Sequence, residues 1–294
     1  MDAVFIVNPQ SGRGKGARIA RELPALVAER GWRARIVTTT APREAVEIAR
    51  RAAGEAPRVI AVGGDGTAHE VVNGLAQAQG RAKLGIIPVG SGNDLASALG
   101  IPTTIDAALD VLVRGHSIKI DLAQFDDRWF ANSLGLGFEA QVTLESMRIR
   151  RLRGFAIYLW ALAKAFRHLR CPHLVVKTDA GTFEGRKLLV SVGNGPRVGG
   201  GFRLTPEATL TDGLLDVCIV DALSHWNVLL TLPGSLQGTH VNSPGVTMLR
   251  TKSLRIDSPD GFPFHADGEI IDVNRKSLSI RIVPHALEVI LSPS

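Results

Sequence analysis

The chain contains few aromatic residues and few cysteines. Phe, Trp and Tyr make up 5% of its 294 residues, which leaves little of the aromatic surface on which proteins stack single-stranded nucleic acid. The two cysteines, Cys171 and Cys218, form no CxxC pair and suit a reducing compartment. We therefore expect no nucleic-acid partner and no disulfide framework.

Long apolar segments are also missing. The longest apolar stretch, residues 155–166, contains Lys164 and is shorter than the roughly 20 residues that a membrane-spanning helix needs. The N-terminus runs from Met1-Asp2 directly into an apolar strand, without the charged and apolar regions of a secretory signal. These features predict a cytoplasmic protein.

Several well-known site motifs are absent. A Walker A loop would need Ser or Thr at Gly16, directly after Gly14-Lys15, and a Rossmann fingerprint would need a third glycine at His69. No second histidine follows His69 at the HExxH spacing, the eight histidines show no zinc-ligand spacing, and Val89 stands where a GxSxG elbow needs glycine. We therefore expect none of these sites.

The overall composition is that of a globular, basic protein. Hydrophobic residues make up 45% and charged residues 21% of the chain, and the length favours two domains or one domain with a large insertion. The net charge of +6 favours an anionic partner, and a nucleotide, a nucleic acid or an anionic membrane would satisfy charge alone.

Strands and helices alternate in the first third of the chain, which predicts a parallel, Rossmann-like sheet with crossover helices. From about residue 118 the pattern changes to short strands with turn residues between them, which predicts an antiparallel β domain, either a sandwich or a barrel-like fold. The expected helices cover about residues 16–30, 42–53 and 67–79 in the first part, and 144–169 and 225–232 in the second, where Ser224 is a candidate N-cap.

Glycine-rich turns follow three of the predicted parallel strands. The turn Gly63-Gly64-Asp65-Gly66-Thr67 comes directly after the apolar residues 59–62. Glycines let backbone N–H groups approach phosphate oxygens, and Asp65 offers a ligand for a phosphate-bound cation. Residues 8–16 and 90–92 form similar turns, so all three lie at the carboxyl edge of one sheet. Each turn alone has a simpler interpretation as a tight turn.

Three carboxylates follow the same strands. Asp65, Asp94 and Asp121 are expected to converge on one crevice, because ligands of open α/β sheets bind at the carboxyl ends of the strands. Three acidic groups beside a polyphosphate would repel it unless Mg²⁺ lay between them. Asn93-Asp94 also has a simpler interpretation, as the cap of the next helix.

Seven motifs follow one another along nearly the whole chain. In order, they are NPQSGRGKG, GGDGTAHEVVNGL, IIPVGSGNDLA, KIDLA, NSLGLGFEA, GGGFRLTPEATLTDGLLDV and FHADGE. This ordered set resembles the diacylglycerol kinase catalytic family, which includes bacterial lipid kinases and sphingosine and ceramide kinases. GGDGT alone also resembles NAD kinase and phosphofructokinase, whereas the ordered set is far more specific.

The resemblance implies a nucleotide-binding α/β domain over residues 1–122, a β-sandwich lipid-substrate domain over 123–285, a C-terminal segment 286–294 that can return to the first domain, and an active site between the two domains. It implies ATP as donor and Mg²⁺ held largely through water by Asp65, Asp94 and Asp121. Ser91 departs from the threonine that is common there but keeps the hydroxyl, and Thr38 and Thr40 are alternatives to Thr39. The implied nucleotide site comprises Asn8, Pro9, Ser11, Gly12, Thr39, Gly63, Gly64, Asp65, Gly66, Thr67, Glu70, Ser91 and Asn93.

The resemblance makes Glu269 the general base, with Asp267 positioning it and Mg²⁺ neutralising the developing charge. On an extended segment the carboxylates of Asp267 and Glu269 would face the same side, with Gly268 between them. Outside the family, Asp-Gly is typical of a surface β-turn.

A second, structural Mg²⁺ site is implied at the turn before the strand that begins near residue 214. In relatives an aspartate and backbone carbonyls hold this ion. The matching groups here are the Asp212 side chain and the carbonyls of Thr209 and Leu214, a weak site because only one ligand is a side chain.

The predicted helix 144–169 carries apolar residues at helical spacing and a basic run from Arg148 to Arg170. Such a helix either packs on the core with a solvated basic face or docks on an anionic membrane, where each basic residue near the headgroups adds about 1 kcal/mol. Because the substrate is expected to be a lipid, we consider peripheral association with the inner face of the membrane. The sequence does not determine the oligomeric state, and a homodimer is one alternative. The basic residues are Arg148, Arg150, Arg151, Arg153, Lys164, Arg167 and Arg170.

The sequence thus predicts an ATP- and Mg²⁺-dependent lipid kinase that converts diacylglycerol to phosphatidic acid. The alternatives are a sphingoid-base or ceramide kinase, a small-molecule kinase resembling NAD kinase, and a non-catalytic nucleotide or lipid sensor. A sensor is expected to have lost carboxylates, yet Asp65, Asp94, Asp121 and Glu269 are all present.

Overall fold

The structure is a computed structural model, and it describes residues 1–79, 81–149, 152 and 155–292. The chain forms two compact units, one of residues 1–122 and 284–294 and one of residues 123–283. Its return to the first unit therefore comes two residues earlier than expected. Two strands have residues in both units, β5 (His116–Phe125) and β13 (Glu269–Leu291).

The first unit is built on the predicted parallel sheet. The strand order is β4-β3-β1-β2, and the end of β13 lies beside β4, where Val289 pairs with Leu84. All of β1 and nearly all of β3 and β4 are buried, because helices cover both faces of a parallel sheet. The strands are β1 (Ala3–Val7), β2 (Ala34–Thr38), β3 (Arg58–Gly63) and β4 (Lys83–Pro88).

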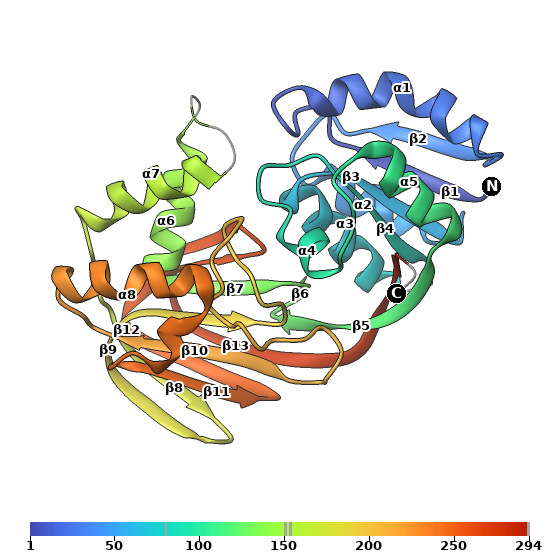
Figure 1. Cartoon of the computed structure of the whole chain (residues 1–294). Helices are drawn as coiled ribbons and strands as arrows, with labels where there is room; N and C mark the ends of the chain where they lie inside the picture. Colours follow the sequence, from blue (N-terminus) through green and yellow to red (C-terminus); the bar gives the residue numbers. More distant parts are fainter. Residues whose placement is uncertain (80, 150–151, 153–154, 293–294) are drawn as a thin grey trace. The chain divides into compact units, whose positions relative to one another are not determined.

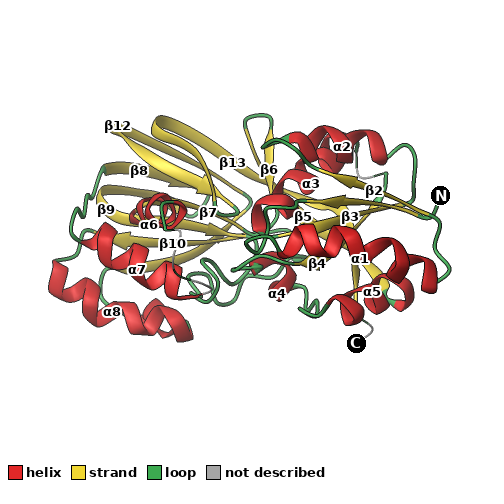
Figure 2. Ribbon diagram, turned by 90° about the horizontal axis from the view of Figure 1, so that it is seen from above, coloured by secondary structure: helices red, strands yellow, loops and turns green. Residues whose placement is uncertain are grey.

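The helices of this unit lie on opposite faces of the sheet. Figure 2 shows α1 and α5 on one side and α2 and α3 on the other. Arg30, just after α1, ties the first pair together through an ion pair of 3.0 Å from its Nε to Asp110 Oδ1. The strand order reverses between β1 and β3, and the helices that follow these strands, α1 and α3, lie on opposite faces. The helices are α1 (Lys15–Glu29), α2 (Glu44–Ala52), α3 (Asp65–Gln77), α4 (Asp94–Ala98) and α5 (Ile105–Arg114).

The second unit is an antiparallel β-sandwich (Figure 1). Its strand order is β11-β10-β9-β7-β12-β13, and the long strands β9 and β12 each pair with β7 at one end and with β8 at the other. β11 was not predicted from the sequence. The strands are β6 (Arg128–Phe130), β7 (Ser133–Gly137), β8 (His173–Thr178), β9 (Gly181–Gly193), β10 (Leu215–Asp221), β11 (Val246–Thr251) and β12 (Ser253–Ala266).

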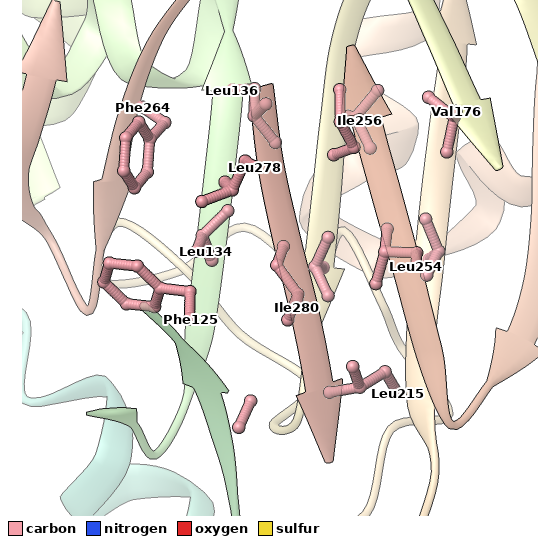
Figure 3. Close-up of a cluster of buried hydrophobic side chains, with 14 of the residues drawn as sticks. Phe125, Leu134, Leu136, Val176, Leu215, Leu254, Ile256, Phe264, Leu278 and Ile280 are labelled. Carbon is pink, nitrogen blue, oxygen red and sulfur yellow. The ribbon is translucent and has the colours of Figure 1, made fainter. Parts of the chain in front are cut away.

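A core of large apolar side chains fills this sandwich. Phe125 meets Phe264 edge to face, with ring centroids 5.7 Å apart, and Leu134 and Leu136 of β7 enter the same core (Figure 3). Because alternate residues of a strand point to opposite faces, Gly135 lies on the other face of the sheet.

The helices of the second unit differ from the prediction. The single helix expected over residues 144–169 is wrong, since two helices, α6 (Phe138–Met147) and α7 (Phe155–Phe166), occupy this region. Gly137, at φ 70°, ends β7 and lets the chain turn into α6. The predicted cap of α8 (His225–Gln237) is confirmed, because Ser224 Oγ accepts the Asn227 N–H at 3.3 Å. Within the described residues, none of the helices is long and apolar enough to cross a membrane.

Candidate functional site

Four loops meet at the carboxyl edge of the parallel sheet in the first unit. Asn8 follows β1, Thr39 follows β2, the turn 64–67 follows β3 and the turn 90–93 follows β4. Asn8 Nδ2 donates to Thr67 Oγ1 at 3.2 Å and so joins the loops after β1 and β3. The strand order reverses between these two strands, and open α/β sheets bind ligands at such a point.

Glycines bring the loops of this edge into backbone contact. A Cβ on Gly90 would lie 2.5 Å from the Cα of Gly64, and a Cβ on Gly12 would lie 2.3 Å from the carbonyl oxygen of Val89. Side chains at these positions would push the loops apart. The glycines that the sequence assigns to phosphate binding are therefore also required for the loops to pack.

Asp65 connects the turns after β3 and β4. Its two carboxylate oxygens accept the N–H groups of Asn93 at 2.7 Å and Asp94 at 2.6 Å, at the start of α4. The structure thus brings Asp65 and Asp94 together, and Asp94 is buried.

Asp121 is fully buried and accepts the N–H of His285 at 2.8 Å. The sequence placed it at the end of a strand, but β5 continues to Phe125, so it lies inside the strand. In the described part of the chain, no three His, Cys, Asp or Glu side chains gather closely enough to hold one metal ion directly. Coordination of Mg²⁺ by Asp65, Asp94 and Asp121 through water stays a prediction.

Other residues of the predicted nucleotide site have local roles in the first unit. Glu70 accepts the N–H groups of Arg43 at 3.0 Å and Ala45 at 3.1 Å and so caps α2. Thr39 is buried, and its N–H donates to the Val7 carbonyl at 2.9 Å. The loops of this edge also carry Pro9, Ser11, Gly66, Ser91 and Asn93, all partly or fully exposed.

The predicted catalytic segment is a tight hairpin turn in the second unit. Asp267 and Gly268 have φ values of 47° and 83°, and Ala266 pairs with Glu269 across β12 and β13. Two central residues with positive φ form a type I′ turn, for which Asp-Gly is a preferred sequence. The expectation of an extended segment with both carboxylates on one side is therefore wrong, and the turn interpretation of Asp-Gly is correct.

Asp267 anchors this turn to the loop between β6 and β7. The side chain is buried, and its carboxylate accepts the N–H groups of Ala131 at 3.0 Å, Asn132 at 2.9 Å and Ser133 at 3.0 Å. Its own N–H donates to the Ser133 carbonyl at 2.8 Å. Because Glu269 is two residues further on, Asp267 fixes the place at which Glu269 leaves the turn.

Sequence reasoning missed Glu139, which lies beside this turn. His265 Nε2 is 3.0 Å from Glu139 Oε1, and both side chains are buried. His265 is thus a hydrogen-bonded strand histidine. The motif NSLGLGFEA, which ends at residue 140, was the available signal for Glu139.

The turn assigned to a structural Mg²⁺ is locally ordered. Asp212 Oδ1 accepts the Leu214 N–H at 3.0 Å. Nearby, burial raises the pKa of Asp216, against the opposing effect of Arg250, whose Nε lies 3.2 Å from Asp216 Oδ1. Thr209 precedes this turn, and binding of a metal here stays a prediction.

Two family descriptions match the chain. The diacylglycerol kinase catalytic domain matches residues 2–125, and the YegS C-terminal NAD kinase beta sandwich-like domain matches residues 132–291. A diacylglycerol kinase of Staphylococcus aureus (strain MRSA252) is 35% identical over 275 residues, which cover 91% of this chain and 85% of the relative. That of Staphylococcus carnosus (strain TM300) is 32% identical over 272 residues, with coverages of 91% and 88%.

Solved structures share the fold of the whole chain. A diacylglycerol kinase from Bacillus anthracis str. Sterne superposes with a TM-score of 0.81 at 24% identity, over 99% of this chain and 97% of the other. Yeast NADH kinase in complex with NADH superposes with a TM-score of 0.53 at 10% identity, over 100% of this chain and 84% of the other. The family descriptions and the sequence relatives show that the chain belongs to the diacylglycerol kinase family and is a kinase whose acceptor is an alcohol group.

Proposed function

We propose that the protein transfers the γ-phosphate of ATP to the free hydroxyl of diacylglycerol, giving phosphatidic acid. The observation that carries this proposal is the likeness to proteins named diacylglycerol kinase over 91% of the chain. The two family descriptions, over residues 2–125 and 132–291, include both the glycine-rich edge and the Asp267-Gly268-Glu269 segment, so the nucleotide side and the acceptor side of the reaction are both represented.

The glycine-rich edge supplies the nucleotide site. α3 begins at Asp65, and the free N–H groups at a helix N-terminus attract phosphate. Asp65, Asp94 and Asp121 would hold Mg²⁺, mainly through water, since carboxylate oxygens are the ligands this hard cation takes. When bound, Mg²⁺ supplies charge neutralisation for the transferring phosphoryl group. Asp212 with the carbonyls of Thr209 and Leu214 would hold the structural ion.

Glu269 supplies the general base. It takes the proton from the lipid hydroxyl as that oxygen bonds to the γ-phosphorus, and the bond from this phosphorus to the β-phosphate oxygen breaks, so that ADP leaves. Asp267 holds the turn from which Glu269 projects.

The NAD kinase alternative shares the architecture of both units, because the yeast NADH kinase superposes over 100% of this chain. The presence of a β-sandwich therefore does not separate a lipid kinase from an NADH kinase. The sequence identity of 35% to proteins named diacylglycerol kinase, against 10% to the NADH kinase, favours the lipid acceptor. Sphingoid bases and ceramide are the alternative lipid acceptors.

We propose that the second unit docks peripherally on an anionic membrane, at the inner face, through α7 and α8. Trp160 on α7 and Trp226, Leu229 and Leu230 on α8 are exposed, and α8 carries no Asp, Glu, Lys or Arg. Interfacial helices bury such a face at the boundary between headgroups and acyl chains. Aromatic contact joins the two helices, since the rings of Phe166 and His225 lie 5.0 Å apart.

Basic residues accompany this apolar surface. Lys164, Arg167 and Arg170 lie in or just after α7 and are exposed, and Arg148 pairs with Glu145 at 2.7 Å. The remaining members of the predicted basic run, Arg150, Arg151 and Arg153, lie outside the described residues. The docking hypothesis thus changes from a basic helix to an apolar surface with basic residues beside it.

A lipid panel tests the acceptor. The protein is incubated with labelled ATP, Mg²⁺ and vesicles that contain diacylglycerol, sphingosine or ceramide, or with soluble NAD, and products are identified by mass spectrometry. We expect phosphatidic acid as the main product and its loss in Asp65→Asn. Phosphorylation of another acceptor in preference, or no lipid-stimulated ATP turnover, contradicts the proposal.

Flotation with anionic liposomes tests the docking surface. We expect the double variant Trp226→Ser, Leu230→Ser to lose most of its liposome binding. Val273→Ser is the matched control, because Val273 is 62% exposed in the same unit but lies on β13. If the double variant binds liposomes as well as the wild type does, the docking proposal is contradicted.

A further inference from the structure

We propose that Glu139 and His265 form a positioning pair that fixes the Asp267-Gly268 turn and thereby the direction of Glu269. This inference rests on the proposed function, because that function gives Glu269 its role as general base. The pair belongs wholly to the second unit, with Glu139 on α6 and His265 on β12, and the two residues are 126 positions apart in the sequence.

Both nitrogens of the His265 ring are engaged. Nδ1 accepts the backbone N–H of Gly268 at 3.3 Å, and Nε2 lies 3.0 Å from Glu139 Oε1. A backbone N–H can only donate, so Nδ1 must present its lone pair. The neutral ring then carries its proton on Nε2 and donates it to the Glu139 carboxylate. The two contacts therefore select one tautomer. In the neutral ring, Nδ1 can accept from Gly268 only if the proton is on Nε2, and Nε2 can donate to Glu139 only if Nδ1 carries none.

Gly135 provides the space for Glu139. Gly135 of β7 pairs directly with His265 of β12, and a Cβ at position 135 would lie 2.2 Å from Glu139 Cδ. The Glu139 carboxylate thus lies over the glycine and against the histidine. A buried carboxylate is costly without a hydrogen-bonding partner, and His265 supplies one. The motif NSLGLGFEA contains both Gly135 and Glu139, which gives this motif a role in the site.

The turn is therefore held at two successive residues. The Asp267 carboxylate binds the backbone of residues 131–133, and the Gly268 N–H binds His265. Together these bonds fix the peptide plane between Asp267 and Gly268, from which the chain continues into Glu269. Rotation of that plane would swing the Glu269 backbone, and a displacement of about 1 Å at a reacting group can cost on the order of a hundredfold in rate.

Two substitutions of His265 separate its two contacts. His265→Asn keeps an acceptor where Nδ1 lies and loses the contact with Glu139, whereas His265→Gln keeps a donor where Nε2 lies and loses the acceptor for Gly268. We expect His265→Gln to lower kcat by roughly tenfold to a hundredfold, with the KM for ATP unchanged, and His265→Asn to lose less. Gly135→Ala, which crowds Glu139, is expected to lower kcat in the same way. Equal kcat in wild type and His265→Gln overturns the pair while the lipid kinase function stands.

A spectroscopic measurement on the wild-type protein needs no active variant. With ¹⁵N-labelled histidine, two-bond correlation spectra distinguish a ring protonated at Nε2 from one protonated at Nδ1, and His265→Asn identifies the resonance. We expect His265 as the neutral Nε2–H tautomer. A ring protonated at Nδ1, or at both nitrogens at neutral pH, overturns the proposal even if the wild type phosphorylates diacylglycerol. If the wild-type protein instead has this tautomer but phosphorylates no lipid, the proposed function is refuted. The pair then keeps only its structural role of holding the turn.

Discussion

The glycine-rich edge of the first unit and the Asp267-Gly268 turn of the second are assembled in different ways. At the edge, parallel strands deliver successive loops to the same place, and the backbones of Gly64 and Gly90 come into contact. At the turn, the Asp267 carboxylate reaches backbone groups up to 136 residues away. The sheet topology brings the loops of the edge together before any side chain contributes, whereas dedicated buried side chains position the turn.

The largest effect on kcat is expected from replacing the general base while the contacts that hold the turn stay intact. Glu269→Gln keeps the size of the side chain and leaves the bonds of Asp267 and His265 in place. General-base catalysis contributes about 10²–10⁴-fold, so kcat for diacylglycerol phosphorylation should fall by that factor, with the KM for ATP unchanged. Steady-state kinetics on mixed vesicles measure it. Full activity in a folded Glu269→Gln protein would remove Glu269 from its role.

The same substitution made in both regions tests whether the turn depends more on its carboxylate than the edge does. Hydrogen bonds to charged groups contribute about 1.5–3 kcal/mol each. Asp267→Asn weakens three such bonds at a buried site, and we expect it to lower the free energy of unfolding by about 3 kcal/mol. Asp65→Asn weakens two at a partly exposed site, with an expected loss of about 1–2 kcal/mol. Urea denaturation of both variants gives the comparison, and the reverse order would contradict it.

What the sequence predicts well differs between these regions for a physical reason. The edge was predicted because its information is local: apolar strands followed by glycine-rich turns imply a parallel sheet with its loops at one edge. The turn geometry was mispredicted, because alternation of side chains holds only on an extended backbone, and Asp267 and Gly268 have positive φ. The Asp-Gly dipeptide carried the correct signal.

Two further kinds of feature were not predicted from the sequence: contacts between residues far apart in the chain, and the points at which helices end. Glu139 and His265 are 126 residues apart, and without the fold no spacing rule connects them. The helix expected over residues 144–169 was wrong because apolar and basic residues continue through the region where α6 ends and α7 begins. The exposure of Trp226 and Leu230 also depends on which face of α8 packs on the sandwich, which the weakly amphipathic α8 sequence does not specify.

A side chain inserted between the loops of the edge should weaken nucleotide binding. In Gly90→Ala the new Cβ would lie 2.5 Å from Gly64 Cα and 2.9 Å from Asn93 Oδ1, so the loops must separate. We expect the KM for ATP to rise roughly tenfold, equivalent to about 1.4 kcal/mol of binding free energy. Gly54→Ala is the matched control, because its Cβ would meet only the Arg51 carbonyl oxygen at 3.6 Å. An unchanged KM in Gly90→Ala would show that the contact between the loops is not needed for nucleotide binding.

The smallest effect is expected at the single side-chain bond that joins the loops after β1 and β3. Thr67→Val keeps the shape of the side chain but removes the oxygen that accepts from Asn8 Nδ2 at 3.2 Å. A typical hydrogen bond contributes about 1 kcal/mol, so the KM for ATP should rise about fivefold. Thr67→Ser keeps the hydroxyl and should stay near the wild-type value. If serine and valine raise the KM equally, loss of the Thr67 methyl group costs as much as loss of its hydroxyl, and the bond to Asn8 has no special role in joining these loops.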